Sequence, residues 1–395
     1  MSIYIVAAKR TPFGSFGGSL KGLSATKLCV ESTKAAFAQG NINPEIVDSV
    51  YVGNVIQSSP DAAYLSRHVG VKTGVPINVQ ALTINRLCGS GFETVAQGAQ
   101  AIQLGLSKVS VCGGAENMSA APMTIDGNAA RWGTPLGKGL QANDSLWSGL
   151  TDSHAGTPMG VTAENLAKKH GITREQCDEF AVRSQVQWGK AKEAGHFEGE
   201  MAPIEVKTRK GMVTIDADEH PKPSTTVDQI SKLKPVFDKE GVVTAAGASG
   251  ICDGAGTIIL ASEEAVKEHG LKPLCKLTAW NSVGCEPTEM GIGPVPAIKN
   301  ALKIAGKTLD EVDRFEINEA FAAQFLSCAK ELSLDMDKTN INGGAISIGH
   351  PLGASGSRIV AHLANEFERN ADMNVAVGSA CIGGGQGIAV VLERV

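Results

Sequence analysis

The sequence predicts an α/β protein made of two halves with the same fold and a long segment inserted between them. Three observations support this prediction. Short matches recur at one offset, predicted strands alternate with predicted helices in each half, and the composition changes between Ser119 and Val243. Strands that alternate with helices form mostly parallel sheets whose faces are covered by the helices.

The internal repeat has an offset of 265 residues. Val47–Val50 (VDSV) recurs as Val312–Phe315 (VDRF), and Leu87–Gly91 (LCGSG) recurs as Leu352–Gly356 (LGASG). A third match at this offset pairs Lys34 and Ala36 with Lys299 and Ala301. Three matches at one offset indicate that the two halves share a fold.

Both halves show the same order of elements: a strand, a Gly/Ser turn, an amphipathic helix and a further strand. In the first half the strands are expected at 79–84 and 109–112, and in the second half a strand is expected at 375–377. Apolar residues at helical spacing predict the helices between them. They are Phe92, Val95, Ala96, Ala99 and Ile102 in the first half and Ile359, Val360, Leu363 and Phe367 in the second.

The segment between the halves is predicted to carry substrate contacts. Pro, Gly, Trp and Met are frequent in it, and a polar helical stretch (Thr173–Ala194) and a Lys-rich run follow. Long inserted segments are often functional, and a structural or oligomerisation flap is the alternative. The predicted units are residues 1–118 with 244–268, the inserted residues 119–243, and residues 269–395.

The composition is typical of a globular protein. Of 395 residues, 43% are hydrophobic and 19% charged, and the net charge of −5 provides no basic field for a nucleic-acid partner. The nine cysteines show no C-x-x-C pair and no zinc-site spacing, which predicts free thiols in a reducing compartment and no metal. No apolar run approaches the roughly 18 to 20 residues that span a bilayer, so no transmembrane segment is expected.

The N-terminal segment is basic. The first acidic residue is Glu31, and Lys9, Arg10, Lys21 and Lys27 precede it in a stretch rich in Ser and Thr. This bias is typical of a mitochondrial address that stays on the folded protein, and it predicts the mitochondrial matrix. The alternative is an ordinary basic first strand and loop of a cytoplasmic protein.

Cys88 is the candidate nucleophile. It lies in a small-residue turn between a predicted strand and a predicted helix, where free backbone N–H groups favour a thiolate and lower a cysteine pKa. The flanking glycines permit close approach of a ligand to the backbone. The alternative is a buried cysteine that only packs.

His350 and Asn318 are candidate partners of Cys88. The repeat places His350 opposite Asn85, so that the two turns come face to face and the imidazole can take the thiol proton. Asn318 follows a predicted strand (Arg314–Ile317) and can hold a water or a substrate carbonyl. The alternatives are a structural histidine before a proline and a helix cap.

Cys381 opens a glycine-rich segment, CIGGGQG, directly after a predicted strand. Exposed N–H groups of such a segment can stabilise an oxyanion, and a second thiol can act as acid and base. A phosphate loop is the alternative, but the segment has neither G-x-G-x-x-G spacing nor a Walker lysine.

Four motifs, in this order and spacing, resemble those of the thiolase family: NRLCGSG, NEAFA, GHPLGASG and CIGGGQG. The similarity runs along essentially the whole chain. It implies the thiolase fold, in which two pseudo-symmetric βαβαβαββ halves pack in five layers (αβαβα) around an inserted loop domain. It also implies a homodimer or a homotetramer built from dimers.

The resemblance implies a role for each motif residue. Cys88 would be the acylated nucleophile, His350 its base, and Cys381 the acid and base that moves the substrate proton. A water on Asn318 would form one oxyanion hole with His350, and the N–H groups of Cys88 and Gly383 would form the other. Two holes are expected because two different carbonyls, a thioester and a 3-keto group, become oxyanions.

Coenzyme A contacts are implied in the loop domain, at Met159, and in the Ala248-Ser249-Gly250 turn. Lys222 and Thr225 occupy positions that resemble nucleotide-phosphate contacts. Degradative members more often carry arginine where Lys222 stands, and lysine keeps the charge without the bidentate fork.

The implied reaction is acyl transfer from a 3-ketoacyl-CoA to CoA with release of acetyl-CoA, with CoA and acyl-CoA as substrates and no other cofactor. Thr157-Pro158 precedes Met159, whereas members specialised for acetoacetyl-CoA resemble one another in having histidine there. The N-terminal and active-site stretches resemble the mitochondrial branch of fatty-acid β-oxidation. The alternatives are an acetoacetyl-CoA thiolase, a condensing enzyme of the same fold and a non-catalytic acyl-CoA carrier.

Overall fold

The computed structural model describes residues 2–209 and 211–395. The first half contains β1 (Ile3–Arg10), β2 (Gly14–Ser15), α1 (Ala25–Gly40), β3 (Ser49–Gly53), α2 (Leu65–Lys72), β4 (Gln80–Ile84), α3 (Ser90–Gln103), β5 (Val109–Asn117), β12 (Cys252–Ser262) and α9 (Glu263–Glu268). The second half contains β13 (Cys275–Gly284), α10 (Pro294–Ala305), β14 (Arg314–Ile317), α11 (Ala322–Leu332), α12 (Ala345–Ile348), α13 (Leu352–Arg369), β15 (Val375–Ile382) and β16 (Gln386–Glu393).

The inserted segment contains β6 (Met123–Ile125), α4 (Gly127–Trp132), β7 (Ala142–Asp144), α5 (Ser145–Gly149), β8 (Thr151–Asp152), β9 (Thr157–Pro158), α6 (Met159–His170), α7 (Arg174–Glu193), β10 (Ile204–Thr208), β11 (Gly211–Ile215) and α8 (Val227–Ile230). The short 3-10 helices are η1 (Pro44–Ile46), η2 (Ala62–Tyr64), η3 (Leu87–Gly89) and η4 (Pro287–Ile292).

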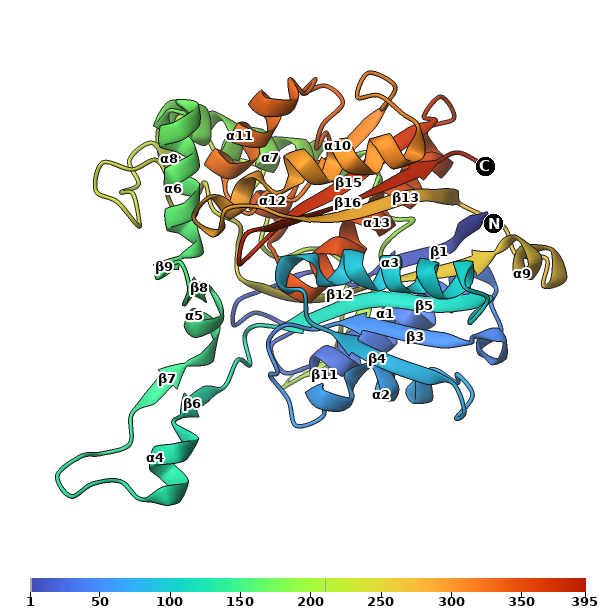
Figure 1. Cartoon of the computed structure of the whole chain (residues 1–395), viewed down its shortest axis with the longest axis horizontal. Coiled ribbons are helices and arrows are strands. Elements are labelled where there is room, and N and C mark those ends of the chain that lie inside the picture. The colour runs from blue at the N-terminus through green and yellow to red at the C-terminus, as the bar shows by residue number, and fades with distance from the viewer. Residues whose placement is uncertain (1, 210) are drawn as a thin grey trace.

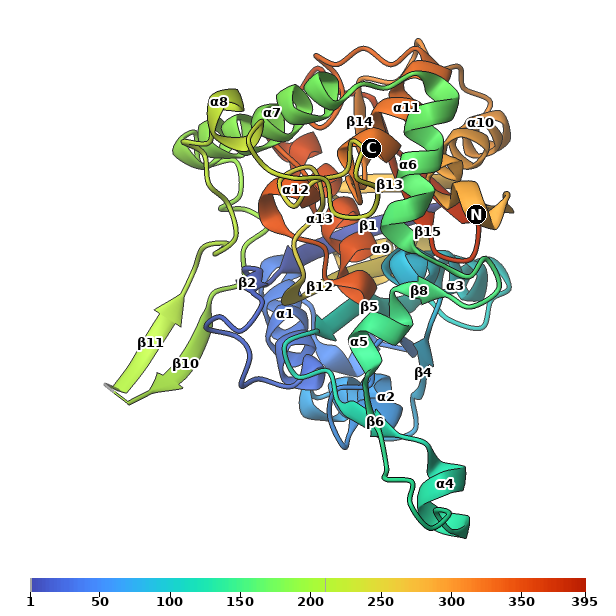
Figure 2. The ribbon, with the colours of Figure 1, turned by 90° about the vertical axis from the view of Figure 1, so that its left-hand side faces the viewer.

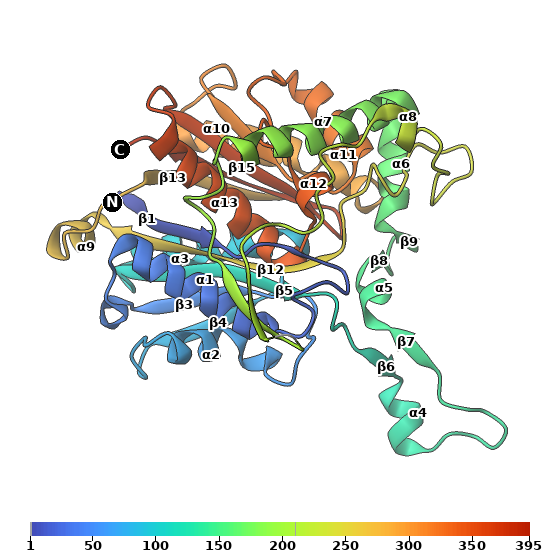
Figure 3. The ribbon, with the colours of Figure 1, turned by 180° about the vertical axis from the view of Figure 1, so that it is seen from behind.

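The strands of the two halves form one ladder in the order β14-β15-β16-β13-β1-β12-β5-β3-β4. The two halves join where β1 pairs with β13 over Ile3–Ile5. Helices α3 and α13 lie between the two parts of this ladder, α1 and α2 cover one outer face, and α10 and α11 lie on the other (Figures 1 and 3). The predicted five-layer α/β architecture is confirmed.

The core lies between the layers. The predicted apolar faces of α3 and α13 meet in one cluster that contains Phe92, Val95, Ile359 and Leu363, all fully buried. Each such side chain stabilises the fold by about 1.5–3 kcal/mol. This burial holds the N-terminal ends of the two helices together, where the two repeated turns lie.

Asp48 and Asp313 make the same contacts in the two halves. Asp48 Oδ2 accepts hydrogen bonds from the N–H groups of Lys108 and Val109, at 2.7 and 3.0 Å, where β5 begins. Asp313 Oδ2 accepts from Asn374 and Val375, at 2.7 and 3.1 Å, where β15 begins. The duplicated fold that the repeat predicts therefore extends to single hydrogen bonds.

The structure differs from the expected elements in two places. The strand expected at 109–112 continues to Asn117, because residues 113–117 pair with β12, and their small and polar side chains conceal the strand from pattern analysis. In the described part of the second half, the third strand of the βαβαβαββ order is reduced to one parallel bridge between Phe315 and Thr339.

The inserted segment partly packs on the second half and partly extends away from the molecule. Helices α6 and α7 contact α11. An arm formed by residues 123–144 projects from the body (Figure 1), and the β10–β11 hairpin projects elsewhere (Figure 2). Within residues 2–209 and 211–395, no helix is both long enough and apolar enough to cross a membrane.

Candidate active site

Cys88 lies in a strained turn directly before α3. Leu87, the preceding residue, has a φ of 47°, in the left-handed region that a leucine rarely adopts. The turn is held by Ser90, whose Oγ accepts from the Arg86 N–H at 2.9 Å and donates to the Leu87 carbonyl at 2.7 Å. These bonds present the half-buried thiol of Cys88 at the wall of a pocket.

The pKa of Cys88 is raised, not lowered. Burial raises it to about 11, and contacts with the N–H groups of Gly383 and of Cys88 itself offset only part of this effect. The expectation of a lowered pKa for Cys88 at a helix N-terminus is therefore wrong. Because the thiol stays protonated near neutral pH, Cys88 needs a base when it reacts.

His350 is arranged as such a base. Its Nδ1 lies 2.5 Å from Ser355 Oγ, which donates to the Pro351 carbonyl at 3.1 Å, so Nδ1 carries the proton and Nε2 is left as the acceptor nitrogen. Burial lowers the pKa of His350 to about 3, which keeps the ring neutral at physiological pH. The main chain is held by a 2.8 Å bond from the His350 N–H to the Gly250 carbonyl.

Asn318 lies beside His350 at the end of β14. Its Nδ2 is 3.4 Å from His350 Nε2, and its backbone N–H donates to the Ser379 carbonyl at 2.9 Å. The side chain is fully buried, yet its Oδ1 has no hydrogen-bond partner. A buried amide oxygen without a partner is suited to hold a water or a ligand group.

Cys381 lies at the end of β15, behind the wall of the pocket. It is fully buried and packs with Met290 and Ala320, with Met159 against them. Burial, followed by the nearby sulfur of Cys88, raises the pKa of Cys381 well above its usual value. The two thiols are therefore neighbours, although they are 293 residues apart in the sequence.

Two glycines, Gly91 beside Cys88 and Gly114 on β5, have a packing role that the sequence did not predict. A Cβ on Gly91 would lie 2.5 Å from the Ser357 nitrogen, and a Cβ on Gly114 would lie 1.8 Å from the Gly353 carbonyl oxygen. These glycines permit close contact between the two halves. They bring the turn of His350 against the turn of Cys88.

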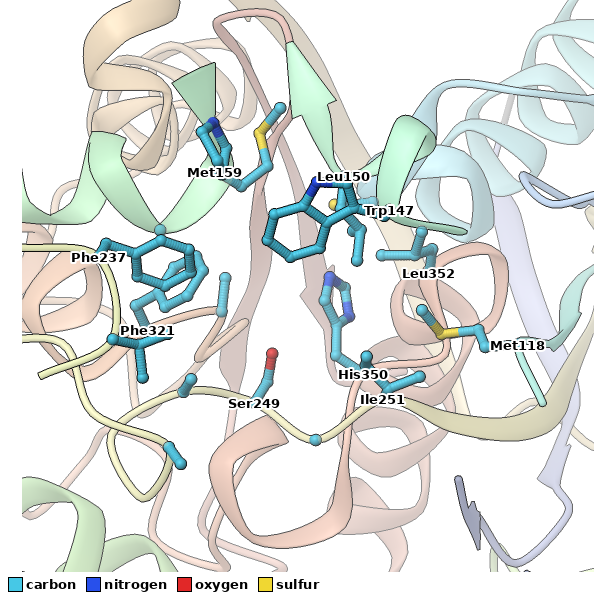
Figure 4. Close-up of a pocket in the computed structure, with 18 of the residues that line it drawn as sticks. Met118, Trp147, Leu150, Met159, Phe237, Ser249, Ile251, Phe321, His350 and Leu352 are labelled. Carbon is cyan, nitrogen blue, oxygen red and sulfur yellow. The ribbon is translucent and has the colours of Figure 1, made fainter. Parts of the chain in front are cut away.

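A pocket of about 350 Å³ opens at Cys88 and His350. Of the predicted site residues, Cys88, Met159, Ala248, Ser249 and His350 line it. Figure 4 shows Phe237 and Phe321 on one side of His350 and Met118 and Leu352 on the other. The lining is mostly apolar, which favours binding of a chain with few polar groups.

A second pocket, of about 310 Å³, adjoins the first and shares Ala245 and Ala248 with it. Lys222 and Thr225 line it together with His220. The Lys222 N–H donates to Gln185 Oε1 at 2.7 Å, and Thr225 Oγ1 donates to the Lys222 carbonyl at 2.7 Å. Two pockets in series, one apolar and one with a basic side chain, fit a long ligand with an anionic end.

The structure brings the predicted residues together in three groups. The first pocket is lined by Cys88, His350, Met159, Ala248 and Ser249. The second pocket is lined by Lys222 and Thr225. Directly behind the first pocket lie Asn318, Cys381 and Gly383. Sequence reasoning missed the apolar lining from Met118, Trp147, Leu150, Phe237 and Phe321. Only the position of Trp147, Leu150 and Phe237 in the inserted segment indicated their function.

Among the described residues, no group of three or more His, Cys, Asp or Glu side chains is placed to hold a metal ion.

Comparison with known proteins gives a consistent result. The thiolase N-terminal domain matches residues 3–264, and the thiolase C-terminal domain matches residues 271–394. The mitochondrial 3-ketoacyl-CoA thiolase of Bos taurus is 56% identical over 392 residues, which cover 99% of this chain and 98% of the relative. The crystal structure of the human mitochondrial 3-ketoacyl-CoA thiolase has a TM-score of 0.98 at 55% identity, covering 100% of this chain and 99% of that one. The human enzyme in complex with CoA has a TM-score of 0.97 at 54% identity, with 100% and 98% covered. The chain therefore belongs to the thiolase family.

Proposed function

We propose that the chain transfers the acyl group of a 3-ketoacyl-CoA to CoA, with release of acetyl-CoA, through a thioester on Cys88. The observation that carries this proposal is that Cys88 and His350 line one apolar pocket and that Cys381 lies next to Cys88, directly behind it. The chain is an acyltransferase whose substrates are CoA and acyl-CoA.

In the first half-reaction, His350 Nε2 takes the proton of Cys88, and the sulfur attacks the 3-keto carbon. The N–H groups of Cys88 and Gly383 hold the resulting oxyanion, because they lie at the sulfur to which that carbon binds. The bond between the α-carbon and the keto carbon then breaks. Cys381 protonates the carbanion, acetyl-CoA leaves, and Cys381 remains as a thiolate.

Asn318 and His350 act on the departing acetyl-CoA. As the bond breaks, negative charge moves onto the thioester oxygen. A water on the unpartnered Asn318 Oδ1, together with His350, would donate hydrogen bonds to that oxygen. The two oxyanion sites thus serve two different carbonyls.

In the second half-reaction, the Cys381 thiolate takes the proton of an incoming CoA thiol. The CoA sulfur attacks the acyl group on Cys88, and the Cys88 sulfur leaves and recovers its proton from His350. All protons return to their starting groups, so the enzyme is ready for another cycle. The neutral resting state of His350 and the protonated state of Cys88 agree with this order of events.

We assign the inserted residues 119–243 and the Ala248-Ser249-Gly250 turn to CoA binding. Lys222 and Thr225 would contact the nucleotide phosphates in the second pocket, and Met159, Ala248 and Ser249 would line the channel that leads to Cys88. Pro158 stands before Met159, and the apolar lining accommodates more than an acetyl group. Chains longer than that of acetoacetyl-CoA are therefore the expected substrates.

Incubation with an acyl-CoA, followed by measurement of the intact mass, tests the proposal. The expected result is a covalent acyl adduct that is absent from Cys88→Ser and is discharged by CoA. An adduct that persists in Cys88→Ser would contradict it. Thiolysis rates measured across acyl-chain lengths separate the broad-chain reaction from acetoacetyl-CoA cleavage, which is expected to be the slower.

We further propose a homodimer that pairs into a homotetramer. Strand β4 is an edge of the ladder, and its neighbourhood exposes Ile77 and Leu82, so that it offers unpaired backbone groups and apolar area to a second copy. On the arm, Trp132 and Leu136 are also exposed. Sedimentation of the purified protein measures the assembly directly.

We propose the mitochondrial matrix as the location. The relative from Bos taurus is named as mitochondrial, and the first acidic residue of this chain is Glu31. Import of the full chain into isolated mitochondria, without a change in its mass, is the expected result. Retention outside the organelle would favour the cytoplasmic alternative.

A further inference from the structure

Glu116 is a fully buried carboxylate at the end of β5 that the proposed reaction does not use. Its Oε1 accepts from the Ile56 N–H at 2.9 Å and from Asn54 Nδ2 at 3.0 Å. Its Oε2 accepts from the Gly353 N–H at 2.8 Å and from the Val55 N–H at 3.2 Å. All four donors are neutral, so this buried carboxylate is held without a cation.

The four donors come from both halves of the molecule. Gly353 lies in the first turn of α13, three residues after His350, and a carboxylate at the N-terminus of a helix is favoured by the helix dipole. Val55 and Ile56 follow β3, and they pack in one apolar cluster with Leu352 and with Cys88. Glu116 therefore binds the segment that contains His350 to the segment that surrounds Cys88.

The contact has little freedom to move. A Cβ on Gly353 would lie 3.0 Å from Glu116 Oε2 and 2.8 Å from the Gly53 carbonyl oxygen. The Gly353 carbonyl in turn lies where a Cβ on Gly114 would be, at 1.8 Å. With backbone packed on backbone, a change in the carboxylate is transmitted to the turn that precedes α13.

Glu116 also acts on Cys88 through its charge. Burial is the largest cause of the raised pKa of Cys88, and the negative charge of Glu116 raises it further. Burial likewise raises the pKa of Glu116 itself, to about 7, with Asp253 on β12 adding to the effect. The other titratable groups around Cys88 are Cys381 on β15 and His350 before α13.

We propose that Glu116 is a positioning residue that holds the turn of His350 against the turn of Cys88 and that places a negative charge beside the Cys88 segment. The inference rests on the proposed function only in taking His350 as the base of Cys88. It gives Glu116 two separable effects. One depends on the length of the side chain and the other on its charge.

Two variants separate these effects. Glu116→Gln removes the charge, and its amide turns donors toward backbone N–H groups that need an acceptor. Glu116→Asp keeps the charge, but it is one methylene too short to reach Gly353 and Ile56 together. Asp313→Asn is the matched control, because Asp313 also accepts from two backbone N–H groups, those of Asn374 and Val375 at 2.7 and 3.1 Å, and it lines neither pocket.

The first measurement is the pH dependence of Cys88 alkylation by iodoacetamide, followed by intact mass. With Glu116→Gln the inflection is expected to move to lower pH by about one unit, because a like charge has been removed. With Glu116→Asp and with Asp313→Asn it is expected to stay at the wild-type value. This reaction needs no acyl-CoA, so its result does not depend on the proposed function.

The second measurement is steady-state thiolysis. Both Glu116 variants are expected to lower kcat about 10- to 100-fold, with KM for the acyl-CoA changed less than about twofold, whereas Asp313→Asn keeps the wild-type kcat. Wild-type alkylation and wild-type kcat in Glu116→Gln would overturn the inference. If that variant does not fold, an unchanged kcat in Glu116→Asp would overturn it. Absence of thiolysis in the wild type would contradict the proposed function instead.

Discussion

Gly91 in α3 and Gly356 in α13 lie backbone against backbone where the two halves meet. A Cβ on Gly91 would be 2.5 Å from the Ser357 nitrogen, and a Cβ on Gly356 would be 2.3 Å from the Phe92 nitrogen. Because both neighbours are main-chain atoms, neither can move aside alone. This contact joins the two turns that contain Cys88 and His350. The proposed chemistry therefore requires glycine at both positions, because a methyl side chain at either one would push the turns apart.

The contact predicts the effect of adding one methyl group. Gly91→Ala is expected to lower the free energy of unfolding by about 1–3 kcal/mol and to reduce thiolysis in the protein that remains folded, because the helices must separate. Thermal unfolding and an acyl-transfer assay measure the two effects. Gly22→Ala is the control, since a Cβ there would meet no atom within 4 Å. Equal behaviour of the two variants would contradict the prediction.

Burial of neutral His350 predicts a pH dependence of stability. Its pKa is about 3 in the folded chain, below its ordinary value, so the unfolded chain binds more protons between about pH 6.5 and pH 3. The stability associated with this group is present above pH 6.5 and is lost as the pH falls, by roughly 1 kcal/mol per pH unit. Denaturant unfolding at several pH values should show a flatter acid slope for His350→Asn than for the wild type.

Cys381 is expected to be essential for turnover and not for the reactivity of Cys88. Cys381→Ala should lower thiolysis at least about 100-fold, because no group then protonates the leaving carbanion. Alkylation of Cys88 should persist in this variant, since His350 still accepts its proton. Cys29→Ala is the control and is expected to retain turnover. It removes a buried thiol in the core between α1 and the first-half strands. Full thiolysis by Cys381→Ala would eliminate the proposed acid.

Lys222 is expected to affect the binding of CoA and not the chemical step. Lys222→Ala should raise KM for CoA about fivefold at low salt, with kcat unchanged, because an exposed charge contributes about 1 kcal/mol. The difference should shrink at high ionic strength. Lys222→Arg should bind CoA at least as tightly, since the guanidinium can form two parallel hydrogen bonds with a phosphate. Lys34→Ala, on α1, provides the control for loss of one surface charge.

The arm is expected to determine the size of the assembly. Trp132 and Leu136 are 81% and 105% exposed, and apolar side chains this exposed mark an interaction site when they lie close together. A Trp132→Ser, Leu136→Ser double variant should sediment as a smaller assembly and keep its thermal stability. Leu104→Ser, at an exposed position outside the arm, should leave the assembly unchanged. If both variants sediment as tetramers, the arm is not part of the interface.

The sequence alone predicted the architecture and named the candidate site residues. Apolar periodicity located α3 and α13, the 265-residue offset identified the duplicated halves, and the four motifs identified Cys88, Asn318, His350 and Cys381. These features are local, or repeat in one dimension, so they can be recognised before folding is considered. The pattern at 109–112 stopped short of Asn117 because strand pairing with β12, and not side-chain alternation, holds the rest of β5.

Only the tertiary structure decided how these candidate groups are solvated and packed. A helix N-terminus by itself predicts a lowered pKa for Cys88, but burial reverses that effect, and burial depends on segments far away in the sequence. The same holds for the neutral state of His350, for the contact of Gly91 with Ser357, and for the four donors that Glu116 collects from two halves of the chain. Solvation and close packing arise from all neighbours in space at once, and no spacing within one segment of sequence records them.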